Sequence, residues 1–299
     1  MADKSGQADL RGLDVDKLAK GFADEANILK NFVTMSKTKA REIRWYQKTS
    51  GFLDSTDTTG ITASQLFNVG EKARPVVVEQ SWTRNTSYAK KFFVESPTIS
   101  MEDIKDSDVD ILATNVRDLV RAVARQVDQR IYDVLTEATT SGTPNPTNVE
   151  TTAAVADGWD DAATGDPIKD LLIGQRKIRN NGYDSSQAVL LIHPVEHQNL
   201  LQFLISVKGS SFPNFAGEKL QNGVVMSLLG NRVVVSSNAT TDYAVQFVPS
   251  RSVTFKQFVP MTSVVMDDPG IGKKIRVWEE GEALLTDPKS VHIITDTVV

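Results

Sequence analysis

The chain has 299 residues, a net charge of −5 and no cysteine. The mild acidic balance argues against nucleic-acid binding by the whole surface, because such domains carry a strong basic excess. The absence of cysteine excludes disulfides, iron–sulfur clusters, thiolate zinc sites and cysteine nucleophiles. No apolar run approaches the roughly 20 residues that a membrane-spanning helix needs, and the N-terminus has no apolar core of signal-peptide type. We therefore expect a protein that is made in a cytoplasm and has no membrane partner.

The N-terminal segment has the pattern of an amphipathic arm. From Leu13 to Met35, apolar side chains recur at helical spacing and form one stripe. The stripe consists of Leu18, Phe22, Ala26, Leu29 and Phe32/Val33. Such a helix needs a partner surface. Residues 46–70 are rich in Thr, Ser and Gly, which predicts extended or loop structure.

Two β-rich runs follow this loop. Val76, Val78 and Trp82 share one parity, and a second run covers Tyr88 to Val94. Together the runs predict a long hairpin. The hairpin has little apolar surface for its length, so we expect it to project and to lean on another surface.

The strongest helical pattern in the chain runs from Ser107 to Ala138. Its apolar positions recur every three or four residues, at Val109, Leu112, Val116, Leu119, Val123, Val127, Ile131 and Val134. Ser107 or Asp108 can cap it, and acidic residues in its first turns suit the helix dipole. A helix of this length spans roughly 45 Å, which indicates a girder across the molecule.

The second half of the chain mixes helices and strands. Residues 139–166 are polar and contain Pro144 and Pro146, so they predict a long connection at a domain boundary. Asp166 and Pro167 open a second amphipathic helix, which Gly182 ends. A strand over Ala188–Ile192 and a short helix from Pro194 follow.

Short β-runs dominate the C-terminal part. Val224–Leu228 and Arg232–Ser236 flank a Gly230-Asn231 turn and predict a hairpin. Tyr243–Val248 is a further strand, and the tail holds MTSVVMDD, the turn PGIGKK, IRVWEEGEALLTD and SVHIITD. The elements interleave without a regular βαβ series, so the predicted fold class is α+β.

The segment HPVEH contains His193 and His197 four residues apart, a spacing that zinc proteases use on one helix. Here Pro194 directly follows His193, and a residue before proline avoids the helical region. His193 should therefore end the strand, while His197 lies in the first turn of the helix. The pair then shares no helical face, and no third ligand is evident. We interpret the segment as a strand–turn–helix joint.

Two further patterns resemble functional motifs. DDPGIGKK lacks the first glycine and the final Ser or Thr of a phosphate-binding loop, which predicts a β-turn instead. Arg117, Arg121 and Arg125 form a basic stripe on the long helix, either as a solvated face or as a surface for phosphate or an acidic partner. The sequence nominates no catalytic, cofactor-binding or metal-binding residue.

The order of these elements resembles a known family. One segment is similar to the strand and long spine helix of this family: ISMEDIKDSDVDILATNVRDLVRAVARQVDQRIYDVL. Asp128 lies where the family usually has an aspartate late in that helix. DPIKDLLIGQRKIRNNGYDSSQAVLLIHPVEHQNLL is similar to an axial-domain helix, turn, strand and proline-started helix. MSLLGNRVVVSSNA resembles a family hairpin, and IRVWEEGEALLTDPKSVHIIT resembles the closing strands. These segments, within residues 74–299, resemble the major capsid proteins of tailed double-stranded DNA phages, which have the Hong Kong 97-type fold.

The resemblance implies four parts. They are an N-terminal arm over residues 1–45, an extended loop over 46–94, a peripheral domain over 95–140 and 263–287, and an axial domain over 141–262 and 288–299. It also implies hexamers and pentamers that close an icosahedral shell around the phage genome, without sequence-specific DNA contacts. A separate scaffolding protein, a portal and an optional decoration protein would be partners. The protein would be assembled in the host cytoplasm and reside in the virion.

Two alternatives remain open from the sequence. A bacterial nanocompartment shell of the encapsulin type has the same fold, and a metal-dependent enzyme could be built on HPVEH. Some family members also join subunits through a lysine–asparagine isopeptide bond. Lys72, Lys90 and Lys91 lie near the expected extended loop, although nothing in the sequence marks one of them as reactive.

Overall fold

The computed structural model describes residues 28–48, 71, 74, 82–106, 111–139, 142–155, 157–161, 164–207 and 227–298. The predicted arm helix before residue 28 and almost all of the predicted loop over 46–70 lie outside these residues. So do Val76, Val78 and Lys72, and the proposed capping residues Ser107 and Asp108.

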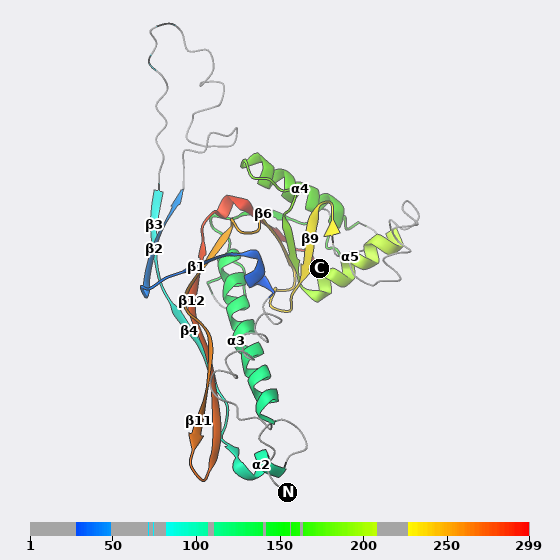
Figure 1. Ribbon diagram of the computed structural model, residues 1–299. Coiled ribbons are helices and arrows are strands. Elements are labelled where there is room, and N and C mark those ends of the chain that lie inside the picture. Colours follow the sequence, from blue (N-terminus) through cyan, green and yellow to red (C-terminus); the bar gives the residue numbers. More distant parts are fainter. Residues whose placement is uncertain are drawn as a thin grey trace.

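One sheet is built on a long C-terminal hairpin. Among the described residues its strand order is β1-β11-β12-β4, and β5 also pairs with β12. The strands are β1 (Thr34–Lys37), β4 (Lys90–Glu95), β5 (Ile99–Ser100), β11 (Val253–Asp268) and β12 (Gly272–Leu285). The pairing of β1 with β11 is parallel, and the other pairs are antiparallel. Figure 1 shows the hairpin running beside a single long helix, with helix α2 (Met101–Asp106) near its tip.

The long helix is α3 (Ile111–Leu135), which confirms the predicted girder over most of its length. Its 25 residues correspond to about 37 Å. The predicted stripe is buried at Leu112, Val116, Val123, Val127 and Ile131. The helix ends at Leu135, three residues before the expected Ala138. Glu137, two residues further on, has a left-handed φ of 51°, a conformation common after helix ends.

The second sheet has six strands, and we call it the axial sheet because all six lie in the segments expected to form the axial domain. Its order is β6-β13-β10-β7-β9-β8 in the described part of the chain. The strands are β6 (Glu150–Ala153), β7 (Val189–Ile192), β8 (Ser227–Leu228), β9 (Asn231–Val235), β10 (Tyr243–Phe247) and β13 (Val291–Thr295). Helices α4 (Pro167–Asn180) and α5 (Pro194–Gln202) lie beside this sheet (Figure 1), followed by η3 (Phe203–Val207), while η4 (Pro288–Ser290) leads into β13.

The local signals around α4 and the C-terminal turns predicted the structure well. Asp166 caps α4 by accepting a hydrogen bond from the amide of Lys169, and Pro167 is its first residue. Gly182 follows the helix with a φ of 81°, as the glycine signal indicates. The predicted hairpin is confirmed within the described residues, but its turn is Leu229-Gly230, one residue earlier than expected, and Asn231 is already in β9.

The predicted pairing of the two β-rich runs near residues 76–94 is wrong. Of the first run only Trp82 is described, and the residues between the two runs, where the hairpin turn was expected, form β3 (Trp82–Tyr88). β3 pairs with β2 (Glu42–Lys48) and forms a separate ribbon. The second run is β4, which pairs with β12. The chain continues from β3 into β4 with only Ala89 between them. Alternating side chains indicate a strand, but they do not identify its partner.

The helix predicted to continue to Met35 is also wrong at its C-terminal end. Leu29–Phe32 form a single short 3₁₀ turn, η1, and Val33 is already extended, with φ −107° and ψ 155°. Met35 then pairs with Phe255 in the parallel β1–β11 ladder. The edge of the sheet offers backbone hydrogen bonds that override the local helical pattern.

The polar connection over 139–166 contains a strand that was not predicted. Residues 150–153, Glu-Thr-Thr-Ala, form β6 and pair in parallel with His292–Thr295 of β13. β6 is an edge strand with alternating burial, so it needs few apolar residues. No helix in the described ranges is long and apolar enough to cross a membrane.

The core joins both sheets to α3. One cluster combines Ile131 and Leu135 of α3 with Phe247 of the axial sheet and Phe255 of β11. Leu29 of η1 is fully buried in the same cluster. The root of the N-terminal segment is therefore part of the junction between the two sheets.

Candidate functional site

The joint between β7 and α5 holds the two histidines of HPVEH. His193 is the N-cap of α5, with φ −77° and ψ 157°, and its Nδ1 accepts a hydrogen bond from the amide of Val195 at 3.3 Å. His197 lies inside the helix, where its amide donates to the carbonyl of His193 at 3.1 Å. Because Pro194 keeps His193 out of the helix, the pair lacks the arrangement of the protease motif. The interpretation of a strand–turn–helix joint is confirmed.

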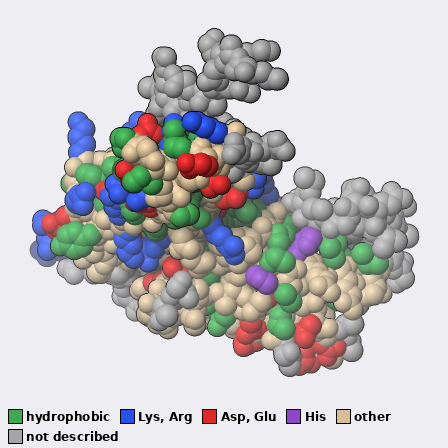
Figure 2. Space-filling view, turned by 90° about the horizontal axis from the view of Figure 1, so that it is seen from below, with side chains coloured by type: hydrophobic (Ala, Val, Ile, Leu, Met, Phe, Trp, Pro, Cys, Tyr) green, Lys and Arg blue, Asp and Glu red, His purple; other side chains and the backbone are tan. Residues whose placement is uncertain are grey.

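Glu196 of the same segment is hydrogen-bonded to the backbone near β10. Its side chain is fully buried, and Oε1 accepts a hydrogen bond from the amide of Asp242 at 2.6 Å. Burial raises the pKa of Glu196. Within the described ranges, no group of three or more His, Asp or Glu side chains is arranged to hold a metal ion. Figure 2 shows histidine side chains on this face that lie apart from the groups of acidic side chains.

The segment DDPGIGKK is the turn between β11 and β12, as predicted. Asp267 lies opposite Lys273 and Asp268 opposite Gly272. Gly270 has a φ of 77°, and a Cβ on Gly272 would lie 2.0 Å from the carbonyl oxygen of Ile99. Gly270 thus permits the tight turn, and Gly272 permits the close backbone contact.

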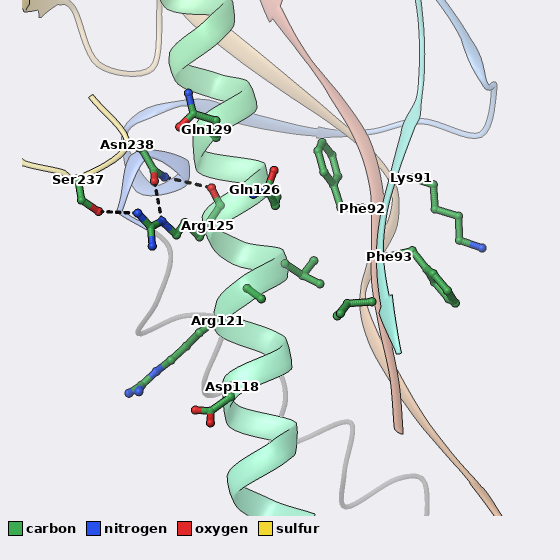
Figure 3. Close-up of a pocket in the computed structure, with 13 residues that line it drawn as sticks. Lys91, Phe92, Phe93, Asp118, Arg121, Arg125, Gln126, Gln129, Ser237 and Asn238 are labelled. Atoms are coloured by element: carbon green, nitrogen blue, oxygen red, sulfur yellow. Dashed lines mark hydrogen bonds between the residues drawn. The ribbon is translucent and has the colours of Figure 1, made fainter. Parts of the chain in front are cut away.

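A cleft of 860 Å³ lies between α3 and β4. Figure 3 shows Phe92 directed toward α3, whereas Lys91 and Phe93 extend to the other side of the strand. Arg121 points away from the strand. Sites for small ligands bring a few polar groups together at one point, and these side chains do not converge. The cleft therefore has the character of a packing surface.

The three arginines of the basic stripe on α3 have different surroundings. Arg125 donates from Nε to Asn238 Oδ1 at 3.0 Å and from Nη2 to Ser237 Oγ at 3.3 Å, as Figure 3 shows. Arg117 lies 3.6 Å from its neighbour Asp118, and Arg121 is exposed. Arg125 thus binds the turn after β9 to α3, and the stripe is not one continuous free surface.

Asp128 faces the root of the N-terminal segment. Its carboxylate accepts hydrogen bonds from the amides of Ile28 at 2.7 Å, Leu29 at 3.2 Å and Lys30 at 3.2 Å. The side chain is only 2% exposed. Burial raises the pKa of Asp128 to about 6, although the three amides and Lys30 oppose the rise. The resemblance singled out Asp128, but the sequence alone gave it no partner.

Buried glutamates on β12 bind cations from other elements. Glu279 accepts a hydrogen bond from Lys30 Nζ at 2.5 Å and another from Gln257 Nε2 at 2.9 Å. Glu282 binds the guanidinium of Arg130 on α3, with Nε 3.0 Å from Oε1. Sequence reasoning missed these pairs, because the partners lie far apart in the chain and each residue looks like an ordinary surface charge.

The β2–β3 ribbon has one face of aromatic and charged side chains, on which Glu42 pairs with Arg44 at 2.6 Å. The opposed pairs Tyr46–Arg84 and Arg44–Thr86 place their side chains on the same side, together with Tyr88. Tyr46 and Tyr88 are 60% and 64% exposed, whereas Ile43 on the other side is buried. Aromatic side chains that gather on one exposed face are typical of a surface that contacts a partner.

The lysines considered for covalent crosslinking divide between described and undescribed residues. Lys90 and Lys91 both lie on β4. Lys91 Nζ is 3.8 Å from Glu280 Oε1 and 4.9 Å from the centre of the Phe93 ring. With these contacts, Lys91 has the surroundings of an ordinary surface cation.

Comparisons with known proteins match both the sequence and the fold. A family model described as phage capsid protein matches residues 98–293. A search of curated protein sequences finds no match.

Several solved structures are similar along nearly the whole chain. The capsid of cyanophage P-SCSP1u has a TM-score of 0.63 at 13% identity, over 99% of this chain and 92% of that one. A Mycobacterium phage Che8 structure has a TM-score of 0.61 at 16% identity, over 91% and 92%. A virus-like particle from Pyrococcus furiosus has a TM-score of 0.59 at 11% identity, over 94% and 98%.

These likenesses establish the α+β Hong Kong 97-type fold, as the resemblance implied. The family model covers α3, both strands of the long hairpin and the axial sheet as far as the middle of β13, which is well over half of the chain. The chain belongs to the phage capsid protein family.

Proposed function

We propose that the protein is the major capsid subunit that assembles into hexamers and pentamers and closes an icosahedral shell around the phage genome. The match of residues 98–293 to the phage capsid family carries this proposal. The exposed aromatic face of the β2–β3 ribbon supports it, because that face gains a partner when neighbouring subunits meet. Many copies of one weak contact then stabilise a closed shell.

We propose a separate role for each of four parts of the chain. Residues 1–45 act as the N-terminal arm and residues 46–94 as the extended loop. Residues 95–140 and 263–287 form the peripheral domain, and residues 141–262 and 288–299 form the axial domain. Arm and loop reach neighbouring subunits, while the axial domain lies toward the centre of each hexamer or pentamer.

The proposed partners are a separate scaffolding protein, the portal, an optional decoration protein and packaged double-stranded DNA. With a net charge of −5, the chain is not suited to tight binding of DNA over its whole surface. The shell therefore encloses DNA without reading its sequence. Assembly takes place in the host cytoplasm, and the role is structural, with no catalytic step.

The nanocompartment alternative is less well supported. The virus-like particle from Pyrococcus furiosus shares the fold at 11% identity, whereas the family model that matches is that of phage capsids. The metal-enzyme alternative has no support in the HPVEH joint, where His193 caps a helix.

Analysis of particle contents tests the proposal. The full chain is produced during phage growth, and particles are isolated by sedimentation and treated with nuclease. A phage shell contains nuclease-protected DNA and this chain as its most abundant protein. Particles that carry a folded enzyme as cargo and no DNA would favour the nanocompartment, and absence of the chain from virions would refute the proposal.

A further inference from the structure

The root of the N-terminal arm is attached to α3 through backbone groups. The described part of the chain begins at Ile28, and the amides of three successive residues, 28–30, all donate to the carboxylate of Asp128. The donor and acceptor are about a hundred residues apart in sequence. Two of the amides share Oδ2 and the third binds Oδ1. The carboxylate therefore fixes both the position and the direction of the chain at this point.

Asp128 supplies a cap that the local sequence lacks. The turn η1 begins after Ile28, whose side chain makes no capping hydrogen bond. Amides at the start of a helical turn have no partner within the turn, and they need an acceptor when buried. Asp128 is itself 2% exposed. The amide of Leu29 and the carboxylate of Asp128, both buried, therefore satisfy groups that would otherwise lack partners.

Lys30 provides a second attachment on another element. Its Nζ lies 2.5 Å from Glu279 Oε1 on β12 and 5.5 Å from the centre of the Phe255 ring on β11. The Lys30 side chain is 14% exposed and that of Glu279 is fully buried. The same short turn is thus held to α3 by its backbone and to the long hairpin by its side chain.

Apolar contacts and backbone pairing continue the attachment along the chain. Leu29 is fully buried in the core cluster that joins both sheets. The amide of Ser250 donates to the carbonyl of Phe32 at 2.7 Å, and Thr34–Lys37 pair with β11. The path of residues 28–37 is therefore set by β11 and the turn before it, while Asp128 sets where this path begins.

We propose that Asp128 is the positioning residue of the N-terminal arm, and that shell closure requires its hold on residues 28–30. The inference rests on the proposed function, in which the arm reaches a neighbouring subunit. With residues 28–30 fixed, the point at which the preceding residues join the folded chain is the same in every subunit. Without this hold, the preceding residues start from a variable point, and contacts that must repeat around a closed shell lose their common geometry.

The test compares Asp128→Ala and Asp128→Asn with Asp118→Ala in the full chain. Asp118 lies on the same helix, and its side chain is 62% exposed. Hydrogen exchange is measured on the unassembled proteins, and shell yield is measured by electron microscopy. Asp128→Asn keeps the size of the side chain and one acceptor oxygen, so it remains informative if the alanine variant does not fold.

We expect exchange at the amides of residues 28–30 to rise at least tenfold in Asp128→Ala, a factor that corresponds to about 1.4 kcal/mol. Asp128→Asn should lie between Asp128→Ala and the wild type, and Asp118→Ala should match the wild type. Protection within α3 should persist, while the yield of closed shells falls in the same order as the protection at 28–30. A general loss of stability would instead raise exchange along α3 as well.

Two results would overturn the inference. Unchanged exchange at residues 28–30 in folded Asp128→Asn would show that the carboxylate does not hold the arm. Normal shells from a variant that has lost this protection would show that assembly does not need the attachment. If the wild-type chain forms no shells under any condition, the proposed function fails instead, and the exchange result still reports on the attachment itself.

Discussion

The guanidinium of Arg130 on α3 donates from both Nε and Nη2 to Oε1 of Glu282 on β12. The side chain of Glu282 is fully buried and that of Arg130 is 23% exposed. This pair joins the spine helix to the long hairpin. Breaking a buried pair leaves an uncompensated charge, which costs far more than the pair itself contributes.

Arg130→Met should therefore lower the free energy of unfolding by about 3–5 kcal/mol. The double variant Arg130→Met/Glu282→Gln should lose clearly less, because it removes the unpaired carboxylate. Urea unfolding of the unassembled protein measures both. Arg251→Met is the control, since its pair with Asp287 is exposed and should contribute less than about 1 kcal/mol. Equal losses in Arg130→Met and Arg251→Met would contradict this account of the pair.

The close packing of α4 on the axial sheet gives a second expectation. A Cβ on Gly174 would lie 1.8 Å from Gln246 Oε1 and 2.8 Å from His292 Cδ2. Overpacking of a core costs about 1–3 kcal/mol, which outweighs the roughly 1 kcal/mol that alanine gains over glycine in a helix. Gly174→Ala should lower the melting temperature, whereas Arg176→Ala at an exposed position of α4 should not. A stabilised Gly174→Ala protein would mean that α4 sits further from the sheet.

His292 should make stability depend on pH. It is fully buried on β13, and burial lowers its pKa to about 4 from 6.5. Glu150 on β6 opposes this shift, and Lys177 on α4 adds to it. Below pH 6.5 the unfolded chain takes up a proton that the folded chain refuses until about pH 4. This residue's contribution to stability is therefore complete above that range and declines as the pH falls through it.

The decline should reach at most about 3 kcal/mol. Urea unfolding from about pH 7 to about pH 4.5 measures it, with His292→Leu as the comparison. The leucine variant should show a flatter dependence on pH in this range. Parallel curves for the two proteins would show that His292 titrates normally in the folded state.

Glu137 connects the end of α3 to the chain that leads into β6. Its carboxylate accepts hydrogen bonds from the amides of Thr147 at 2.6 Å, Asn148 at 2.7 Å and Val149 at 3.2 Å. Burial alone would raise the pKa of Glu137, but the hydrogen bond from the side-chain amide of Asn148 at 2.6 Å and the three backbone bonds outweigh it and lower the pKa. Glu137→Ala should cost about 1–2 kcal/mol of stability. Hydrogen exchange should rise at residues 147–149 first, and unchanged exchange there would contradict the assignment.

The outer face of the β2–β3 ribbon should matter for assembly rather than for folding. Tyr46→Ser and Tyr88→Ser replace side chains that are mostly in water, so each should change stability by less than about 0.5 kcal/mol. Together they should reduce the yield of shells. Thr83→Ala alters the opposite side of β3 and serves as the control. Full assembly of the double tyrosine variant would exclude this face as a contact between subunits.

Sequence reasoning succeeded where the signal was local. The Asp166-Pro167 start of α4, the glycine after it and the proline after His193 each act through the backbone of adjacent residues. The period of α3 was equally clear, because its buried stripe repeats over many turns. The fold class followed from the order of these elements.

Sequence reasoning failed where the partner is distant. The β-rich runs on either side of β3 were expected to pair with each other, but β3 itself pairs with β2, some forty residues earlier in the chain, which gave no sign of the pairing. β6 is polar because it is an edge strand, so its composition resembled a loop. The hold of Asp128 on residues 28–30 uses backbone amides, which every sequence has. Such contacts become visible only in three dimensions.

The most direct test of the central claim is electron microscopy of the purified full chain, produced alone and together with its candidate scaffolding protein. The proposed function predicts closed, spherical particles of uniform diameter in at least one of these preparations. A chain that remains monomeric and well folded in both preparations would contradict the claim that this protein builds a shell.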